Sequence, residues 1–210
     1  MEIIHPLLLQ CFKGLQKLDL SYNNLWKMAA ENIKLFGKML YTLQQLRNIR
    51  FAYNMLSNIP EKMFDSTPLL EEIDLSHNSL EQVHCSFKKL NKLKILNLQK
   101  NLIHILDTAS ITNINEISVQ TSLLRNESDF PVVKIRSNSL DCSMCKSYEF
   151  FKWIEESNLF VRERGNLSCG NDEGASVIVN EQIVMSLDRC ATNKLYNKGR
   201  RIVGIINDCM

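Results

Sequence analysis

Cysteines are the residues of this sequence with the clearest chemical potential. The chain has seven among its 210 residues, and four of them fall between residues 142 and 190, at Cys142, Cys145, Cys169 and Cys190. A Cys-x-x-Cys pair performs redox chemistry in a thioredoxin-like strand and helix, and a zinc site needs a second close pair. Here the Cys-x-x-Cys pair follows a predicted repeat strand and is accompanied by two further cysteines, which does not fit the redox setting. Cys169 and Cys190 are too far apart in sequence to form the second close pair of a zinc site. We therefore expect structural disulfides, with three pairings open.

The other residues that support catalysis are not arranged for it. The sequence has no G-x-S-x-G, H-E-x-x-H, P-loop or dinucleotide-binding motif. Its four histidines are scattered through the chain, at His5, His77, His84 and His104. We expect no enzymatic activity, no metal and no cofactor. The net charge of +2 is too small to indicate nucleic acid or an acidic membrane, so a protein, lipid, glycan or nucleic-acid ligand is equally open.

A repeated segment organises the rest of the chain. Residues Leu70 to Leu80, LEEIDLSHNSL, match the leucine-rich-repeat template LxxLxLxxNxL in full. Ile73 and Leu75 alternate with Glu72 and Asp74, which predicts a short strand with one apolar and one polar face. Asn78 follows the strand, and a buried asparagine at that position can bond the backbone groups that each coil leaves open.

Copies of this segment occur on both sides of it. The repeat cores are Leu15-Leu18-Leu20-Asn23-Leu25, Leu46-Ile49-Phe51-Asn54-Leu56, Leu70-Ile73-Leu75-Asn78-Leu80, Leu93-Leu96-Leu98-Asn101-Ile103, Ile114-Ile117-Val119 with Ser122 in place of asparagine, and Phe130-Val133-Ile135-Asn138-Leu140. Their first residues are 31, 24, 23, 21 and 16 residues apart. We predict an α/β fold: a leucine-rich-repeat solenoid, or horseshoe, of about six coils with a parallel concave sheet. The structural asparagines are Asn23, Asn54, Asn78, Asn101 and Asn138.

The convex side is predicted from the segments between strands. Residues Lys27 to Leu43 carry apolar side chains at helical intervals, so we expect one helix there. Phe64 and Phe87 are expected to fill the space between the strands and the outer wall. Cys11 and Cys85 are expected to lie on convex segments as small buried apolar residues.

The last repeat is followed by a segment suited to close the solenoid. Residues Tyr148, Phe151 and Ile154 share one helical face, with Phe150 and Trp153 beside it. Terminal repeats need such a cap with a polar outer side. We therefore expect repeats over 1–137, a cysteine-rich cap over 138–190 and a tail over 191–210.

This cap resembles that of a known receptor family. Repeats that end in Asn-Ser-Leu-Asp-Cys-x-x-Cys, followed by Phe-x-x-Trp-Ile and two spaced cysteines, are similar to the C-terminal part of a Toll-like receptor ectodomain. Many extracellular leucine-rich-repeat proteins share this cap. The resemblance implies disulfides Cys142–Cys169 and Cys145–Cys190. Ser139 stands where the family usually has proline, and Cys-x-x-Cys replaces Cys-x-Cys.

Binding is the activity that a concave sheet offers. Three outward columns are predicted: Lys17, Asn48, Glu72, Ile95, Glu116 and Val132; Asp19, Arg50, Asp74, Asn97, Ser118 and Lys134; and Tyr22, Tyr53, His77, Lys100, Thr121 and Ser137. The first three members of the third column form an aromatic ladder, which suits contact with protein or glycan. The ligand-binding residues we single out are Tyr22, Arg50, Tyr53, Asp74 and His77. A solvated sheet face with no ligand is the alternative.

Cysteine usage and the sequons at Asn126 and Asn166, which are candidate glycosylation sites, indicate an extracellular chain. Met1 to Gln10 does not resemble a signal peptide, and no apolar run is long enough for a membrane span, so we expect a fragment or an incomplete gene model.

The expected function is ligand recognition in an innate immune receptor, with a receptor homo- or heterodimer as one arrangement. A secreted or cell-surface adhesion or decoy protein and a cytosolic scaffold are the alternatives. An uncapped first coil would expose an apolar edge and pair or aggregate through it.

Overall fold

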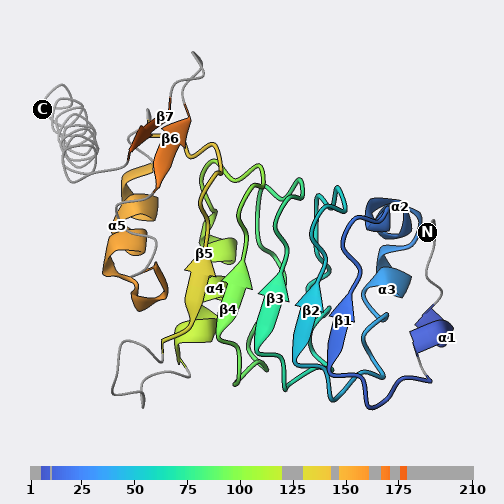
Figure 1. Ribbon diagram of the computed structural model, residues 1–210. Coiled ribbons are helices and arrows are strands. Elements are labelled where there is room, and N and C mark those ends of the chain that lie inside the picture. The colour runs from blue at the N-terminus through green and yellow to red at the C-terminus, as the bar shows by residue number, and fades with distance from the viewer. Residues whose placement is uncertain are drawn as a thin grey trace, which may run out of the picture.

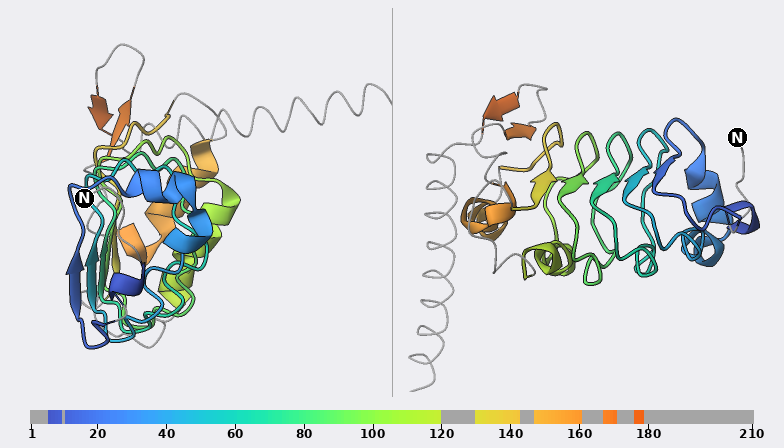
Figure 2. Two further views of the ribbon diagram at one scale, coloured as in Figure 1. Left: turned by 90° about the vertical axis from the view of Figure 1, so that its right-hand side faces the viewer. Right: turned by 60° about the horizontal axis from the view of Figure 1, so that its bottom comes forward.

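The computed structural model describes residues 6–9, 11–119, 130–142, 147–160, 167–170 and 176–178. Five short parallel strands stand side by side in chain order (Figure 1). They are β1 (Lys17–Asp19), β2 (Asn48–Arg50), β3 (Glu72–Asp74), β4 (Ile95–Asn97) and β5 (Val132–Lys134). The strands line one face and the helices of the coils lie on the other (Figure 2). This is the expected leucine-rich-repeat solenoid.

The strand register follows from the repeat template. Leu18, Ile49, Ile73, Leu96 and Val133 are successive partners across the sheet and point inward. The last four of these side chains are at most 1% exposed, whereas Leu18, on the first strand, is only half-buried. Each coil is therefore buried mainly by its neighbours, as expected for a repeat that cannot fold alone.

The fifth predicted repeat is wrong. Residues Thr108–Val119 form the helix α4 behind β4 and β5, and β4 pairs directly with β5 (Figure 1). Asp107 begins this helix, because its Oδ1 accepts from the Ser110 N–H at 2.7 Å. Glu116 therefore leaves the concave column, and its carboxylate accepts from Ser86 Oγ and Phe87 N instead. Ser118 also lies in α4, and Thr121 and Ser122 lie outside the described residues.

The single convex helix predicted over Lys27 to Leu43 is also wrong in its extent. The segment forms α2 (Leu25–Glu31) and α3 (Ile33–Phe36), followed by turns. The break lies at Asn32, which has φ −153° and ψ 85° and whose Oδ1 accepts from the Leu35 N–H at 2.9 Å. An asparagine in extended backbone is a strong helix N-cap, so it starts a second helix instead of continuing the first.

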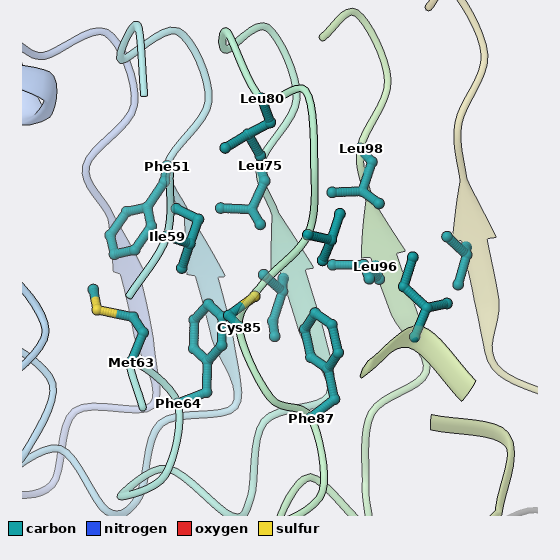
Figure 3. Close-up of a cluster of buried hydrophobic side chains, with 14 of the residues drawn as sticks. Phe51, Ile59, Met63, Phe64, Leu75, Leu80, Cys85, Phe87, Leu96 and Leu98 are labelled. Carbon is teal, nitrogen blue, oxygen red and sulfur yellow. The ribbon is translucent and has the colours of Figure 1, made fainter. Parts of the chain in front are cut away.

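The core is a continuous apolar layer between sheet and convex segments. Phe64 and Phe87 lie beside each other in it, fully buried, with ring centroids 6.2 Å apart (Figure 3). Replacing such a phenylalanine by alanine typically costs about 3–5 kcal/mol. The phenylalanines are core residues, as the sequence predicts.

A ladder of buried asparagines joins the coils. The Asn78 side chain donates from Nδ2 to the carbonyls of Phe51 and Leu75 at 2.9 and 3.0 Å. Its Oδ1 accepts from the N–H groups of Asn54 and Leu56 at 3.1 and 2.9 Å. One amide thus bonds its own coil and the preceding one. Asn54, Asn101 and Asn138 repeat this inter-coil pattern.

The end of the solenoid is covered by a small cap. It comprises α5 (Tyr148–Glu156), the 3₁₀ turn η3 (Asn158–Phe160) and the antiparallel strands β6 (Ser168–Gly170) and β7 (Ser176–Ile178). Phe150, Phe151 and Ile154 of α5 are at most 2% exposed. Trp153 Nε1 donates to Asn115 Oδ1 of α4 at 2.8 Å, so the cap helix is fixed to the last convex helix.

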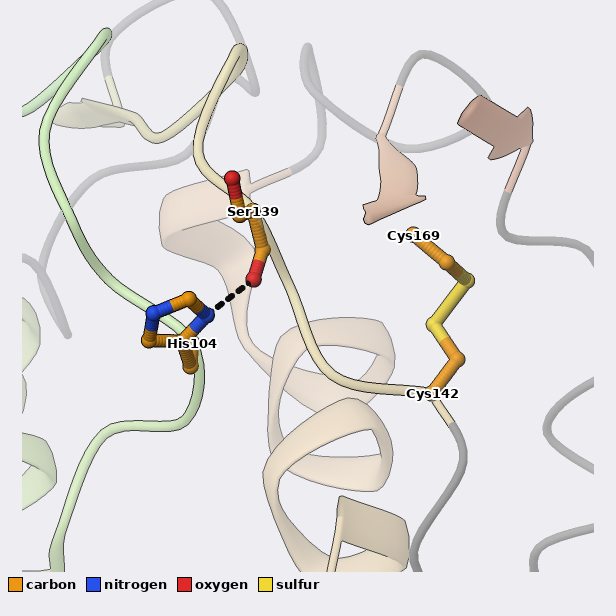
Figure 4. The surroundings of a disulfide bond; sticks show 4 residues. All are labelled: His104, Ser139, Cys142 and Cys169. Atoms are coloured by element: carbon orange, nitrogen blue, oxygen red, sulfur yellow. Dashed lines mark hydrogen bonds between the residues drawn. A yellow bond between two sulfur atoms is a disulfide. The ribbon is translucent and has the colours of Figure 1, made fainter. Parts of the chain in front are cut away.

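A disulfide between Cys142 and Cys169 ties the cap to the last repeat (Figure 4). It is one of the two pairs that the resemblance implies; Cys145 and Cys190 lie outside the described residues, as do Asn126 and Asn166. At the same junction, the His104 Nδ1–H donates to the Ser139 carbonyl oxygen at 2.6 Å. The short α1 (Pro6–Leu9) precedes the first coil at the opposite end.

The two free cysteines of the described residues differ in environment. Cys85 is fully buried, as expected, and burial raises the pKa of its thiol to about 12. Cys11 is exposed, so the expectation that it is buried was wrong. Its coil is the first of the stack and has no preceding coil among the described residues to cover it.

Native-state alkylation checks this difference. Only a thiolate reacts, and a fully buried thiol with a raised pKa forms almost none. Iodoacetamide at mildly alkaline pH should modify Cys11 in the folded chain and modify Cys85 only after unfolding, as read by peptide mass mapping. Equal native labelling of both would contradict the burial of Cys85.

Candidate binding surface

The candidate site is the outward face of the sheet, at the point where the strands end. Tyr22, Tyr53 and His77 each follow a strand and adopt positive φ of 57°, 56° and 54°. Lys100 and Ser137 continue the column with φ of 54° and 57°. A non-glycine residue pays about 1–2 kcal/mol for this left-handed conformation. The next residue in each case is an asparagine whose side-chain hydrogen bonds hold the turn, so the fold itself aligns the column. These bonds are buried except at Asn23, which is half-buried and bonds the Leu20 and Ser21 carbonyls of its own coil.

The three rings stack into one ladder, as the sequence predicts. Tyr22 and Tyr53 have ring centroids 4.2 Å apart at 11° between planes, and Tyr53 and His77 have centroids 3.8 Å apart at 18°. Tyr53 Oη also lies 2.8 Å from His77 Nε2. Tyr22 is 75% exposed and Tyr53 39% exposed, so the ladder is rigid yet open to solvent.

Charged side chains form the neighbouring column. Arg50 lies between Asp19 and Glu72, with nitrogen–oxygen distances of 4.0 Å to each. These long, exposed contacts contribute little to stability and leave the guanidinium able to rearrange toward a ligand. Asp74 is fixed differently, since its Oδ1 accepts from Ser76 N at 2.9 Å and from Ser76 Oγ at 2.6 Å. The five predicted ligand-binding residues therefore lie on adjacent coils of one surface. They are Tyr22, Arg50, Tyr53, Asp74 and His77.

Local hydrogen bonds and charges shift the pKa values of three side chains on this surface. Hydrogen bonds from the Ser21 side chain and backbone, with a contribution from Arg50, lower the pKa of Asp19, which keeps it ionised. A hydrogen bond with Tyr53 raises the pKa of the Tyr22 hydroxyl. Desolvation, and then the positive charge of Lys100, lower the pKa of His77, while Asp74 acts in the opposite direction. His77 is thus neutral near pH 7 and accepts or donates one hydrogen bond at Nε2.

The lowered pKa of His77 predicts a pH dependence. The unfolded chain takes up the proton at a higher pH than the folded chain, so stability is fully present above the ordinary histidine pKa of about 6.5 and is lost as the pH falls through the lower folded value. Lys100→Gln removes a repelling charge and should raise the His77 pKa in an NMR titration, with Lys92→Gln, an exposed lysine in a turn, as control. An unchanged His77 pKa in Lys100→Gln would contradict this cause.

Sequence reasoning missed one residue of this surface. Met55 is 54% exposed with φ 54°, two positions after Tyr53 in sequence, and offers a flexible apolar side chain to solvent. The only signal was its place between the asparagine and the last leucine of the repeat, where the template accepts any residue. Asp19 and Glu72 were placed in columns, but their bracketing of Arg50 was not foreseen.

Metal ligands and membrane-spanning helices were sought among the described residues. These residues contain no cluster of three or more histidine, cysteine or acidic side chains that could hold a metal ion. Within the same ranges, no helix combines the length and apolar character that crossing a membrane requires.

Comparisons with known proteins agree with the fold. The leucine-rich-repeat family model matches residues 14–39 and 69–90. CD180 antigen of mouse is 30% identical over 167 residues, which cover 77% of this chain and 22% of that protein. Chaoptin of Drosophila melanogaster is 33% identical over 108 residues, which cover 50% of this chain and 8% of that protein. Tsukushi of chicken is 30% identical over 136 residues, which cover 62% of this chain and 35% of that protein. The chain thus spans about a third or less of these relatives.

A solved structure matches the same architecture. Human 5T4, also named trophoblast glycoprotein, superposes with a TM-score of 0.58 at 20% identity, over 81% of this chain and 69% of that one. This likeness concerns the fold. The chain is a leucine-rich-repeat protein, and its sequence relatives are extracellular or cell-surface leucine-rich-repeat proteins.

Proposed function

We propose that this leucine-rich-repeat protein is the ligand-recognition module of a Toll-like innate immune receptor, acting outside the cell by binding alone and without catalysis. The observation that carries the proposal is the exposed Tyr22–Tyr53–His77 ladder beside Arg50. Stacked rings held by a fixed backbone lose little conformational entropy on binding, so contacts to them convert efficiently into affinity. Arginine and tyrosine are also the residue types that most often dominate interface energies.

Two features support the extracellular receptor assignment. The Cys142–Cys169 disulfide is stable in an oxidising compartment and is rarely kept in the cytosol. The similarity to CD180 antigen runs over 77% of this chain and so includes most of the repeats. A disulfide in the cap argues against a cytosolic scaffold.

A secreted or cell-surface adhesion or decoy protein is the second candidate, because the similarity to chaoptin and Tsukushi, over 50% and 62% of this chain, is equally compatible with it. The two candidates differ in the domains that the full-length protein carries beyond the cap. A longer transcript that encodes a membrane span and a cytoplasmic signalling domain would support the receptor, and one that encodes neither would support the secreted protein.

Binding to the concave face is tested with matched tyrosine variants. The chain is screened against a lipopeptide, a glycan array, a single-stranded RNA and an array of extracellular proteins. For the ligand found, Tyr53→Ala and Arg50→Ala should each weaken binding by about tenfold or more. Tyr41 is 69% exposed on a convex segment, so Tyr41→Ala is the control and should leave affinity unchanged. Unchanged affinity in Tyr53→Ala and Arg50→Ala would remove the concave face from consideration.

A further inference from the structure

Charges of both signs surround Arg50 on the concave surface. Asp19, Arg50 and Asp74 are successive partners on β1, β2 and β3 (Figure 1). Their side chains therefore follow one another as negative, positive and negative groups in one column. Glu72, two positions before Asp74, adds a third carboxylate near the Arg50 guanidinium. Adjacent strands of a sheet are about 4.8 Å apart, so a ligand that spans this column meets both signs of charge within about 10 Å.

Arg50 is held by charge and not by hydrogen bonds to the described residues. Its guanidinium nitrogens lie 4.0 Å from Asp19 Oδ2 and 4.0 Å from Glu72 Oε1, which exceeds hydrogen-bonding distance. Its side chain is 54% exposed. A guanidinium presents paired N–H donors that match the two oxygens of a carboxylate. We therefore expect a carboxylate as the ligand group at Arg50.

The two aspartates beside Arg50 are fixed by their own turns. Asp19 Oδ1 accepts from the Ser21 N–H at 2.9 Å, and Asp74 Oδ1 accepts from the Ser76 N–H at the same distance. These bonds restrict each carboxylate to one position. Nucleic acid, sulfated glycan and anionic membranes repeat negative charge at short intervals, so an anion next to the one at Arg50 would meet a carboxylate. Like charges placed together across an interface are costly, so a polyanion does not match this column.

The aromatic ladder adds a second restriction. Tyr53 lies on the same coil as Arg50, and its ring stands between Tyr22 and His77, with centroids 4.2 and 3.8 Å away. Since these neighbours come from the coils on either side, both faces of the Tyr53 ring are covered. A nucleobase or sugar ring that stacks needs an open aromatic face. Tyr53 offers its edge and hydroxyl instead, and a ring edge carries partial positive charge that suits a carboxylate.

We propose that the ligand of this surface is a segment of another protein that presents an acidic side chain between basic ones. The proposal rests on the proposed function, because it names the ligand class of the same concave site. The acidic side chain binds Arg50 beside the Tyr53 edge, and the basic side chains contact Asp19 and Asp74. A polypeptide supplies side chains of both signs in a fixed order, as this column requires.

Selection from a phage-displayed library of random peptides tests this ligand class on the full chain. Enriched peptides should carry an acidic residue with a basic residue a few positions to each side. Arg50→Glu should weaken their binding by about tenfold or more, because carboxylate then meets carboxylate. Selection on Arg50→Glu should return peptides with a basic residue in place of the acidic one. Lys92→Glu makes the same charge change at an exposed turn and should leave affinity unchanged.

Competing ligand classes are measured on the same chain, with circular dichroism to show that each variant is folded. The probes are poly(U) RNA, heparin, an array of neutral glycans and phosphatidylglycerol vesicles. A probe of this set that binds more tightly than the peptides, and that Arg50→Ala and Tyr53→Ala both weaken, would overturn the inference and leave recognition by the concave face standing. Peptides that bind wild type and Arg50→Glu equally would also overturn the inference. If neither Arg50→Ala nor Tyr53→Ala weakens any peptide or probe, both the inference and the proposed concave site fail.

Discussion

Asn78→Ala is expected to lower the free energy of unfolding by about 3–5 kcal/mol. The change leaves the buried N–H groups of Asn54 and Leu56 without the Oδ1 that accepts from both. It also removes the Nδ2 donor from the carbonyls of Phe51 and Leu75. Each buried group left without a partner costs about 1–3 kcal/mol, so the loss exceeds that of an ordinary polar substitution. Urea unfolding followed by circular dichroism measures it.

Asn48→Ala is the matched control for the ladder. Asn48 is half-buried on the concave face, and its Nδ2 makes one side-chain bond, to Glu72 Oε2 at 2.9 Å. Its removal should cost about 1 kcal/mol or less. Equal destabilisation by the two substitutions would mean that the asparagine ladder does not join the coils as described.

The double variant Cys142→Ala, Cys169→Ala is expected to lose about 3.5 kcal/mol of stability. The disulfide closes a loop with a sequence separation of 27, and opening it returns that conformational entropy to the unfolded chain. The cap also loses its covalent tie to the last repeat, so α5 should become sensitive to limited proteolysis before the repeats do. Urea unfolding under non-reducing conditions gives the first effect and peptide mapping the second.

Cys11→Ala serves as the control, since Cys11 is exposed and free. It should leave both the unfolding midpoint and the cleavage pattern unchanged. A double variant at Cys142 and Cys169 that is as stable as Cys11→Ala would show that the cap is held by packing of Phe150, Phe151 and Ile154 alone.

Much of the fold was predictable because the repeat template states the role of each position. The parallel register of β1 to β4 follows from aligning Leu18, Ile49, Ile73 and Leu96, and the aromatic ladder follows from counting four residues on from each. Every copy of the template keeps the same offset between the inward residue and the outward column. The ladder was therefore visible in sequence as soon as the repeats were aligned.

The error in the fifth repeat has a physical origin in the template itself. The first two positions of the template, three residues apart, also match the period of a helix, so Ile114 and Ile117 fit both. Asp107 and Ser110 carried the signal that decided for α4, an N-cap with its bonded residue three positions on. Hydrogen bonds between side chains, such as Tyr53 to His77, and the 4.0 Å contacts of Arg50 depend on rotamers that no spacing specifies.

Hydrogen–deuterium exchange with and without the bound ligand is the sharpest test of recognition by the concave face. Binding there predicts slower exchange in residues 48–56 and 72–79, which carry β2, β3 and the ladder residues Tyr53 and His77. Residues 61–68 and 84–92, which lie on convex segments, should exchange at the same rate in both states. Protection confined to 61–68 and 84–92, with 48–56 and 72–79 unchanged, would contradict recognition by this face.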